Sequence, residues 1–137
     1  MKKTLVILLA VLLPLTGWAR PKQKSKQQAA VLYDLRVENL SAPLGIDTDV
    51  PHFSWKIQSD QRNVVQTAYR ILVATTEEEL AADQGTLWDS GEVESREQLW
   101  VPYGGVRLKS GQHAFWKVCV TTNQGKSAWS APQPFGI

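Results

Sequence analysis

Hydrophobic and polar residues alternate most clearly near the C-terminal end of the chain, within residues 108–130. One side of this extended stretch carries Ala114, Trp116, Val118 and Val120, and the other carries His113, Lys117 and Thr121. This period of two predicts a long strand. The turn residues 123–125 follow it, and an apolar run over 127–135 then returns along it. A long hairpin of this kind is typical of the last two strands of an antiparallel sandwich.

Shorter alternating segments predict the remaining strands, over residues 31–38, 52–58, 66–74, 87–91 and 98–103. In the second of these, Trp55 is the expected centre of the core. Thr76 and Glu79 form a capping-box pattern, which predicts a single short helix over 77–82. About seven strands at this spacing predict an all-β, antiparallel two-sheet β-sandwich, fibronectin III- or immunoglobulin-like, with one short helix.

The first predicted strand has a simple alternation, which assigns its side chains to two faces. Tyr33, Leu35 and Val37 should share one face. The opposite face should carry Asp34, Arg36 and Glu38. The alternation therefore predicts a first edge strand.

The N-terminal residues have the pattern of a targeting segment rather than of a folded element. Basic Lys2 and Lys3 precede an apolar run, and small residues at Gly17 and Ala19 suit signal peptidase cleavage. We expect a signal peptide over 1–19, a disordered basic leader over 20–30 and one sandwich domain over 31–137. The product is then exported, to the periplasm or outside the cell, with no membrane span after cleavage.

Charge and cysteine content narrow the class of protein further. The whole chain has a formal charge of +2, but from Ala29 onward it has nine basic and thirteen acidic side chains, a net charge of −4. The sequence shows no cluster of basic residues on a folded face of the kind that would indicate nucleic-acid binding. Cys119 is the only cysteine, so no internal disulfide joins the sheets. We interpret Cys119 as a small apolar filler rather than as a residue covered by a partner domain.

The sequence offers no catalytic, cofactor-binding or metal-binding constellation. Its carboxylate pairs, Asp47 with Asp49 and Asp89 with Glu92, lie in predicted turns, where Asp is favoured for hydrogen bonds to its own backbone. The histidines lack neighbours at metal-ligand spacing. We therefore predict no catalytic residue, no cofactor and no metal for this chain.

Three tryptophans are the candidate site residues: Trp88, Trp100 and Trp129. Sugars bind over flat aromatic faces, so a row of exposed, coplanar rings would indicate a carbohydrate-binding module. Packing within the domain or against a neighbouring domain is the favoured interpretation, and sugar contact remains open. Trp100 is out of phase with its apolar neighbours and is expected on the outside of its strand.

Five segments in order, SAPLGIDTDVPHFSWKI, QTAYRILVAT, LWDSGEVES, LKSGQHAFWKVCV and WS, carry a resemblance to a known family. They resemble the N-terminal module of bacterial α-L-rhamnosidases, glycoside hydrolase family 78. The resemblance covers residues 32–135. In one departure, Ala114 stands where a strand of this type often carries an aromatic residue, and Phe115 follows it.

The resemblance implies a non-catalytic, fibronectin III-like accessory domain, because the catalytic acids of that family lie in a later helical barrel. If the product ends at Ile137, we expect a truncated remnant or a stand-alone module without hydrolase activity. Its implied partners are the downstream domains of the parent hydrolase, and plant rhamnosides or pectic polysaccharide are candidate ligands. The alternative is a free-standing carbohydrate-binding module that uses exposed tryptophans.

Overall fold

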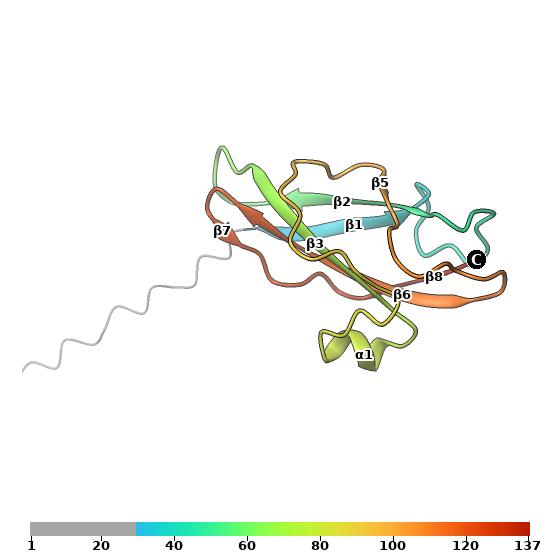
Figure 1. Ribbon diagram of the computed structural model, residues 1–137. Helices are drawn as coiled ribbons and strands as arrows, with labels where there is room; N and C mark the ends of the chain where they lie inside the picture. The colour runs from blue at the N-terminus through green and yellow to red at the C-terminus, as the bar shows by residue number, and fades with distance from the viewer. Residues whose placement is uncertain (1–29) are drawn as a thin grey trace, which may run out of the picture.

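The computed structural model describes residues 30–137 as two antiparallel sheets packed face to face, with one helix on the outside (Figure 1). The predicted all-β sandwich is therefore confirmed. The three-stranded sheet has the order β1 (Val31–Val37), β2 (His52–Gln58) and β5 (Val101–Pro102). The five-stranded sheet has β4 (Trp88–Asp89), β3 (Gln66–Ala74), β6 (His113–Thr122) and β7 (Gly125–Lys126) in that order, and β8 (Gln133–Gly136) also pairs with β6.

The main core fills the space between the sheets and is rich in aromatic rings. Phe53 of β2 contacts four of them, the rings of Trp88, Tyr103, Trp116 and Phe135, at centroid distances of 4.6–6.4 Å. The predicted inner row of β6 and the predicted inward Trp55 are buried here. Phe53 is fully buried and has more ring neighbours than Trp55, so it lies closer to the aromatic centre of this core.

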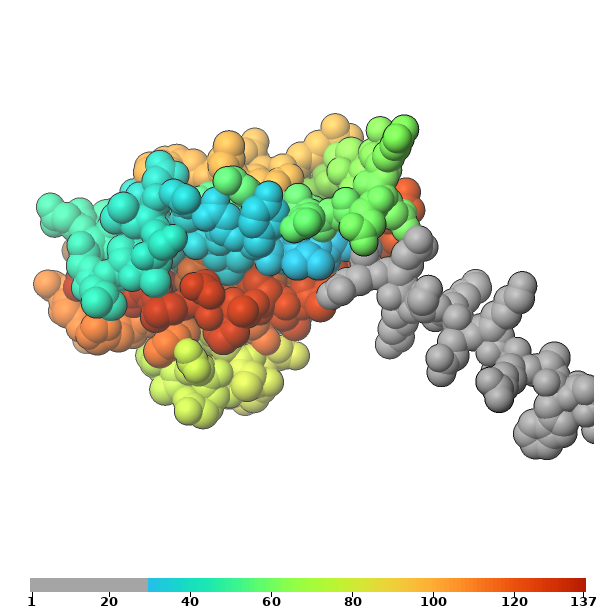
Figure 2. Space-filling view, turned by 180° about the vertical axis from the view of Figure 1, so that it is seen from behind, coloured from blue at the N-terminus to red at the C-terminus, as the bar shows by residue number. Residues whose placement is uncertain are grey.

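A second, smaller core lies on the outer face of the five-stranded sheet, under helix α1 (Glu77–Ala81). Leu80 of the helix packs there with Leu72 and Ala74 of β3. The Thr76 hydroxyl caps the helix by accepting from Glu79 N at 3.2 Å, as predicted, and the helix ends one residue earlier than expected. Figure 2 shows that α1 projects from the body of the sandwich.

The predicted alternation of β1 is wrong in its first half because the strand contains a bulge. The register with β2 shifts between Tyr33 and Arg36, and Asp34 has a φ of 50°. The extra residue turns Leu32 and Leu35 toward the core and leaves Tyr33 45% exposed. A bulge of this kind re-aims side chains without breaking the strand.

Two other predicted strands are shorter than expected. The 98–103 strand pairs only over Val101–Pro102, because the backbone of Trp100 has a left-handed φ of 58° that an extended strand cannot contain. The 127–135 run does return along β6, but only Gln133–Gly136 is a strand. Before it, the hydroxyls of Ser127 and Ser130 accept from the backbone N–H groups of β6 in place of carbonyls.

The chain enters and leaves the sandwich at opposite ends. Val31 pairs with Gln58 at one end, and Ile137 is hydrogen-bonded to Gln112 at the other (Figure 1). The expected signal peptide over 1–19 and nearly all of the expected leader lie outside the described residues. Within 30–137, no helix has the length and apolar character needed to cross a membrane.

Candidate functional site

Trp88 is a structural residue of the main core. It is half buried, and its ring lies 5.3 Å from that of Tyr103 and 6.1 Å from that of Phe53. The turn at Gly104 and Gly105 packs on it so closely that a Cβ at Gly105 would lie 2.4 Å from the Cβ of Trp88. Its indole therefore packs mainly against side chains and turns of its own domain.

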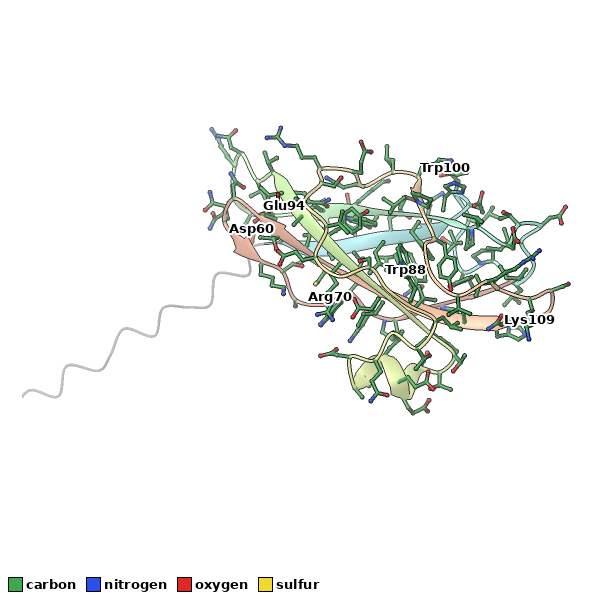
Figure 3. The ribbon with its side chains drawn as sticks, in the orientation of Figure 1. Asp60, Arg70, Trp88, Glu94, Trp100 and Lys109 are labelled. Atoms are coloured by element: carbon green, nitrogen blue, oxygen red, sulfur yellow. The ribbon has the colours of Figure 1, made fainter. Side chains whose placement is uncertain are left out.

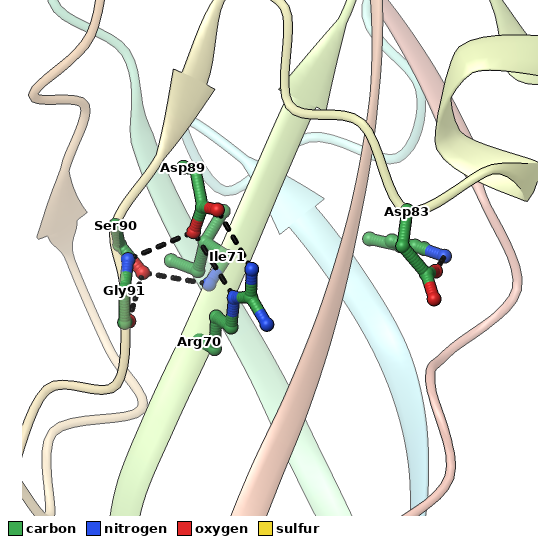
Figure 4. A network of polar contacts seen from close by, with 7 residues as sticks. Arg70, Ile71, Asp83, Asp89, Ser90 and Gly91 are labelled. Carbon is green, nitrogen blue, oxygen red and sulfur yellow. Dashed lines mark hydrogen bonds and ion pairs between the residues drawn. The ribbon is translucent and has the colours of Figure 1, made fainter.

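Trp129 lies on the outer face of the five-stranded sheet, where two cations cover it. The Lys117 ammonium lies 4.6 Å from its ring centroid and the Arg70 guanidinium 5.8 Å. Each cation also binds a carboxylate, Lys117 to Asp83 and Arg70 to Asp89, the latter through two hydrogen bonds (Figure 4). This arrangement explains Trp129 as a cation–π partner that holds the segment 127–130 and the region of α1 onto the sheet.

Trp100 differs from both, because half of its surface is exposed to solvent. One face of its ring stacks on His52 of β2, with a centroid distance of 4.3 Å and an interplanar angle of 8°. His52 is held in turn by Glu38, whose Oε1 accepts from the His52 backbone N at 2.7 Å and lies 2.8 Å from Nδ1. Figure 3 shows Trp100 at the rim of the sandwich, beside β5.

The three tryptophans thus lie in three different layers, and the structure does not bring them together. Trp88 is between the sheets, Trp129 is outside the five-stranded sheet and Trp100 is outside the three-stranded sheet. A continuous row of coplanar rings does not form from this set.

A polar surface that the sequence analysis did not single out lies next to Trp100. We call it the polar face; it is the outer surface of the three-stranded sheet and consists of Asp34, Arg36, Asn39, Ser54 and Lys56, which line a groove of about 270 Å³. The β1 bulge places Asp34 between two cations, at 2.9 Å from Arg36 Nε and 2.8 Å from Lys56 Nζ. Hydrogen bonds from Lys56 and Arg36 lower the pKa of Asp34, so it is ionised at neutral pH.

Two of the carboxylates expected in turns, Asp89 and Asp49, have turn or ion-pair partners. Asp89 accepts from Gly91 N at 2.9 Å and binds Arg70, which lowers the pKa of Asp89. Asp49 lies 3.1 Å from Arg107. Over residues 30–137, no cluster of three or more His, Cys, Asp or Glu side chains could hold a metal ion.

Cys119 is covered by its own domain. It is 2% exposed, on the outer face of β6, and burial raises the pKa of its thiol. A neutral, enclosed thiol has low reactivity, which agrees with its interpretation as an apolar filler.

Comparison with known proteins gives consistent matches. A family described as Rha78A-like, N-terminal immunoglobulin domain, matches residues 32–137. The chain is 37% identical over 117 residues to an α-L-rhamnosidase of Formosa agariphila, a match that covers 83% of this chain and 12% of that protein.

Solved structures of two α-L-rhamnosidases contain a similar domain. The Streptomyces avermitilis enzyme, complexed with L-rhamnose, has a TM-score of 0.73 at 36% identity over 77% of this chain and 10% of its own. The enzyme from Dictyoglumus thermophilum has a TM-score of 0.76 at 34% identity, over 80% of this chain and 12% of its own. The chain therefore spans about a tenth of the length of these relatives.

Proposed function

Because this chain belongs to the family of Rha78A-like N-terminal immunoglobulin domains, we propose that it is the non-catalytic accessory domain of an exported α-L-rhamnosidase of glycoside hydrolase family 78. In this proposal, domains that follow the sandwich carry out hydrolysis of terminal α-L-rhamnosides. The sandwich packs against them and holds the catalytic part away from the N-terminus. The observation that carries the proposal is that the relatives with this domain are named α-L-rhamnosidases and the match fills only about a tenth of their length, while the matching family is described as an N-terminal domain.

The carboxylates of the described domain are consistent with a supporting role. Glycoside hydrolysis needs an acid and a second carboxylate about 5–9.5 Å apart across a sugar-sized cleft. Here Asp34 and Asp89 are each engaged by basic side chains that keep them ionised. A general acid instead needs a raised pKa.

Export is part of the same proposal and rests on the sequence of residues 1–19, a basic start followed by an apolar run and small residues. Its destination is the periplasm or the cell exterior, where plant rhamnosides or pectic polysaccharide would reach the parent enzyme.

The native product in its source cells provides the main test. An antibody raised against residues 30–137 should detect a band far above the 15.3 kDa of this chain. A band at or below that mass would overturn the accessory role and leave a free-standing module. In parallel, the purified chain should release no 4-nitrophenol from 4-nitrophenyl α-L-rhamnoside above a heat-denatured control, and measurable release would show a catalytic site in this domain.

One observation keeps the carbohydrate-binding alternative open, the half-exposed ring of Trp100. A binding face is also compatible with an accessory domain, since a hydrolase can hold its polymer at a distance from the catalytic site.

A further inference from the structure

Left-handed backbone is concentrated around one surface of this domain. Among residues 30–137, seven non-glycine residues have positive φ, and four of them, Asp34, Glu38, Asn39 and Trp100, border the outer face of the three-stranded sheet. Such a conformation costs about 1–2 kcal/mol for a residue with a Cβ, and it is unusual for a bulky one. Strain of this kind persists where the surrounding structure holds a side chain in a required position.

Each strained residue here positions a functional group on the outer face. Asp34 in the bulge places its carboxylate between Arg36 and Lys56. Glu38 and Asn39 form the turn after β1, from which Glu38 holds the ring of His52. Trp100 lies flat on that ring and keeps its other face toward solvent.

The exposed aromatic rings lie at the two ends of this face and the polar groups lie between them. Tyr33, 45% exposed, is opposite Lys56, while Trp100 is stacked on His52, four residues away along β2. At about 3.4 Å per residue, the two rings are separated by roughly 14 Å along the strand. This span fits a short oligosaccharide rather than a single sugar ring.

The chemistry of the face indicates what it binds. With Glu38 at its border, the polar face has two acidic groups (Asp34, Glu38) and two basic groups (Arg36, Lys56), so their formal charges sum to zero and no net field favours an ionic ligand. The groove offers both donors and acceptors, as hydroxyl groups require, and Trp100 offers a flat apolar surface for the C–H face of a pyranose.

A protein partner fits this face less well. Protein interfaces have an apolar centre, depleted of charge, and a polar rim. The polar face has the opposite arrangement, because its centre carries Asp34, Arg36 and Lys56 and its aromatic rings lie at the ends.

We propose that the polar face, together with Trp100 and Tyr33, binds a short uncharged segment of a glycan, with one pyranose ring stacked on Trp100 and hydroxyl groups of its neighbour hydrogen-bonded in the groove. The choice of a rhamnose-containing glycan as ligand rests on the proposed function; the assignment of the face does not. Arg36 and Lys56 donate to sugar hydroxyls and Asp34 accepts from them. The domain would then hold a polymer next to the enzyme that cleaves it.

The test is a titration followed by ¹H–¹⁵N NMR, in which each indole N–H gives its own signal. The purified chain is titrated with a neutral rhamno-oligosaccharide, with L-rhamnose and with anionic oligogalacturonate. We expect a saturable shift of the Trp100 indole and of the Ser54 and Arg36 amides with the neutral oligosaccharide. L-Rhamnose should bind more weakly, and oligogalacturonate should give no saturable shift.

Two variants and one matched control make the assignment specific. Trp100→Gly removes the ring and suits the left-handed backbone, so the fold is retained and saturable binding should be lost. Arg36→Gln should weaken binding while the Trp100 signal still moves. Leu44→Gly changes a more exposed apolar side chain, 74% exposed, outside the polar face, and should bind as the parent does.

Three results would overturn the proposal: no shift at tens of millimolar sugar, equal binding by Trp100→Gly, or shifts confined to Trp129. The last would assign binding to the groove of about 360 Å³ beside α1 that Trp129, Leu80 and Pro132 line. None of these results affects the mass of the native product, so the accessory role is tested independently.

Discussion

The indole Nε1 of Trp55 in β2 donates a hydrogen bond of 3.1 Å to the side-chain oxygen of Gln66 in β3, and so joins the two sheets through a buried polar contact. The amide nitrogen of Gln66 donates to the carbonyl oxygens of Ser95 and Glu97 at 3.0 and 2.9 Å. The Gln66 side chain is 1% exposed. Its amide thus satisfies three buried or half-buried polar groups at once.

Replacing Gln66 by Leu should strongly destabilise the domain. The substitution leaves the Trp55 indole and the two carbonyl groups without this partner, and each unsatisfied buried group costs about 1–3 kcal/mol. We expect the free energy of unfolding in urea to fall by about 3 kcal/mol or more. Gln58→Leu, at an exposed position in β2, is the control and should change it by less than about 0.5 kcal/mol. Equal effects of the two substitutions would show that the buried amide has no special role.

The serine hydroxyls that pair with β6 predict a local effect on hydrogen exchange. Ser130 Oγ accepts from Val118 N at 3.0 Å in a buried position, so Ser130→Ala leaves that amide unpaired. We expect a loss of about 1–3 kcal/mol in stability and faster exchange at Val118 than at other β6 amides. Ser110→Ala, in an exposed turn, should change neither. Unchanged protection at Val118 would contradict a structural role for the Ser130 hydroxyl.

Removal of the ring should change the free energy of unfolding little at Trp100 and lower it strongly at Trp88. Trp100→Gly relieves about 1–2 kcal/mol of left-handed strain and loses about 0.5–1.5 kcal/mol of stacking. Its free energy of unfolding should stay within about 1 kcal/mol of the parent value. Trp88→Ala opens a cavity next to Phe53 and should cost about 3–5 kcal/mol. Thermal or urea unfolding of both variants tests this contrast, and a large loss in Trp100→Gly would show that the ring is a packing residue.

The titration of Tyr103 should make the free energy of unfolding depend on pH in the alkaline range. The single hydrogen of its hydroxyl is shared between the carbonyl oxygens of Leu87 and Val106, and burial raises the pKa of Tyr103 from 10.0 to about 12. The unfolded chain releases the proton first, so the contribution to stability is complete below pH 10 and decreases as pH rises from 10 toward 12.

A Tyr103→Phe variant should be less stable at neutral pH, because two carbonyl groups lose a donor, and its stability should decrease less steeply between pH 10 and 12. Urea unfolding at several pH values gives the two slopes. Parallel slopes for parent and variant would mean that Tyr103 is not the group that titrates.

The sequence predicted β2 and β3 with the bounds that the structure shows, because Phe53, Trp55 and Ile57 in β2 and Tyr69, Ile71 and Val73 in β3 each lie on one face between turn signals. It also predicted α1, because its capping residues are local. The resemblance to the N-terminal module of α-L-rhamnosidases is confirmed by the family match over residues 32–137.

The alternation of apolar and polar residues could not show the positions at which a bulge or a left-handed residue interrupts a strand. Nothing in the order of residues 31–38 marks Asp34 as a bulge, because that conformation depends on its ion pairs with Arg36 and Lys56. The polar face was missed for the same reason. For Trp100 the phase of the sequence did predict an outward ring, but its support by His52 requires contacts between two strands.

The serine hydroxyls bound to β6 were equally hidden, since a serine in an irregular segment gives no sign of its partner. Conversely, Trp88 and Trp129 looked alike in sequence, and only their neighbours distinguish them. Trp88 packs beside Tyr103, and Trp129 packs under Lys117.

The entry and exit of the chain at opposite ends of the sandwich determine how the domain responds to tension. A force applied between Val31 and Ile137 acts along β1 and β8, whose hydrogen bonds to β2 and β6 run across the strands. Those bonds are loaded together in shear rather than opened one after another. The fold is therefore suited to transmit a mechanical load along its long axis.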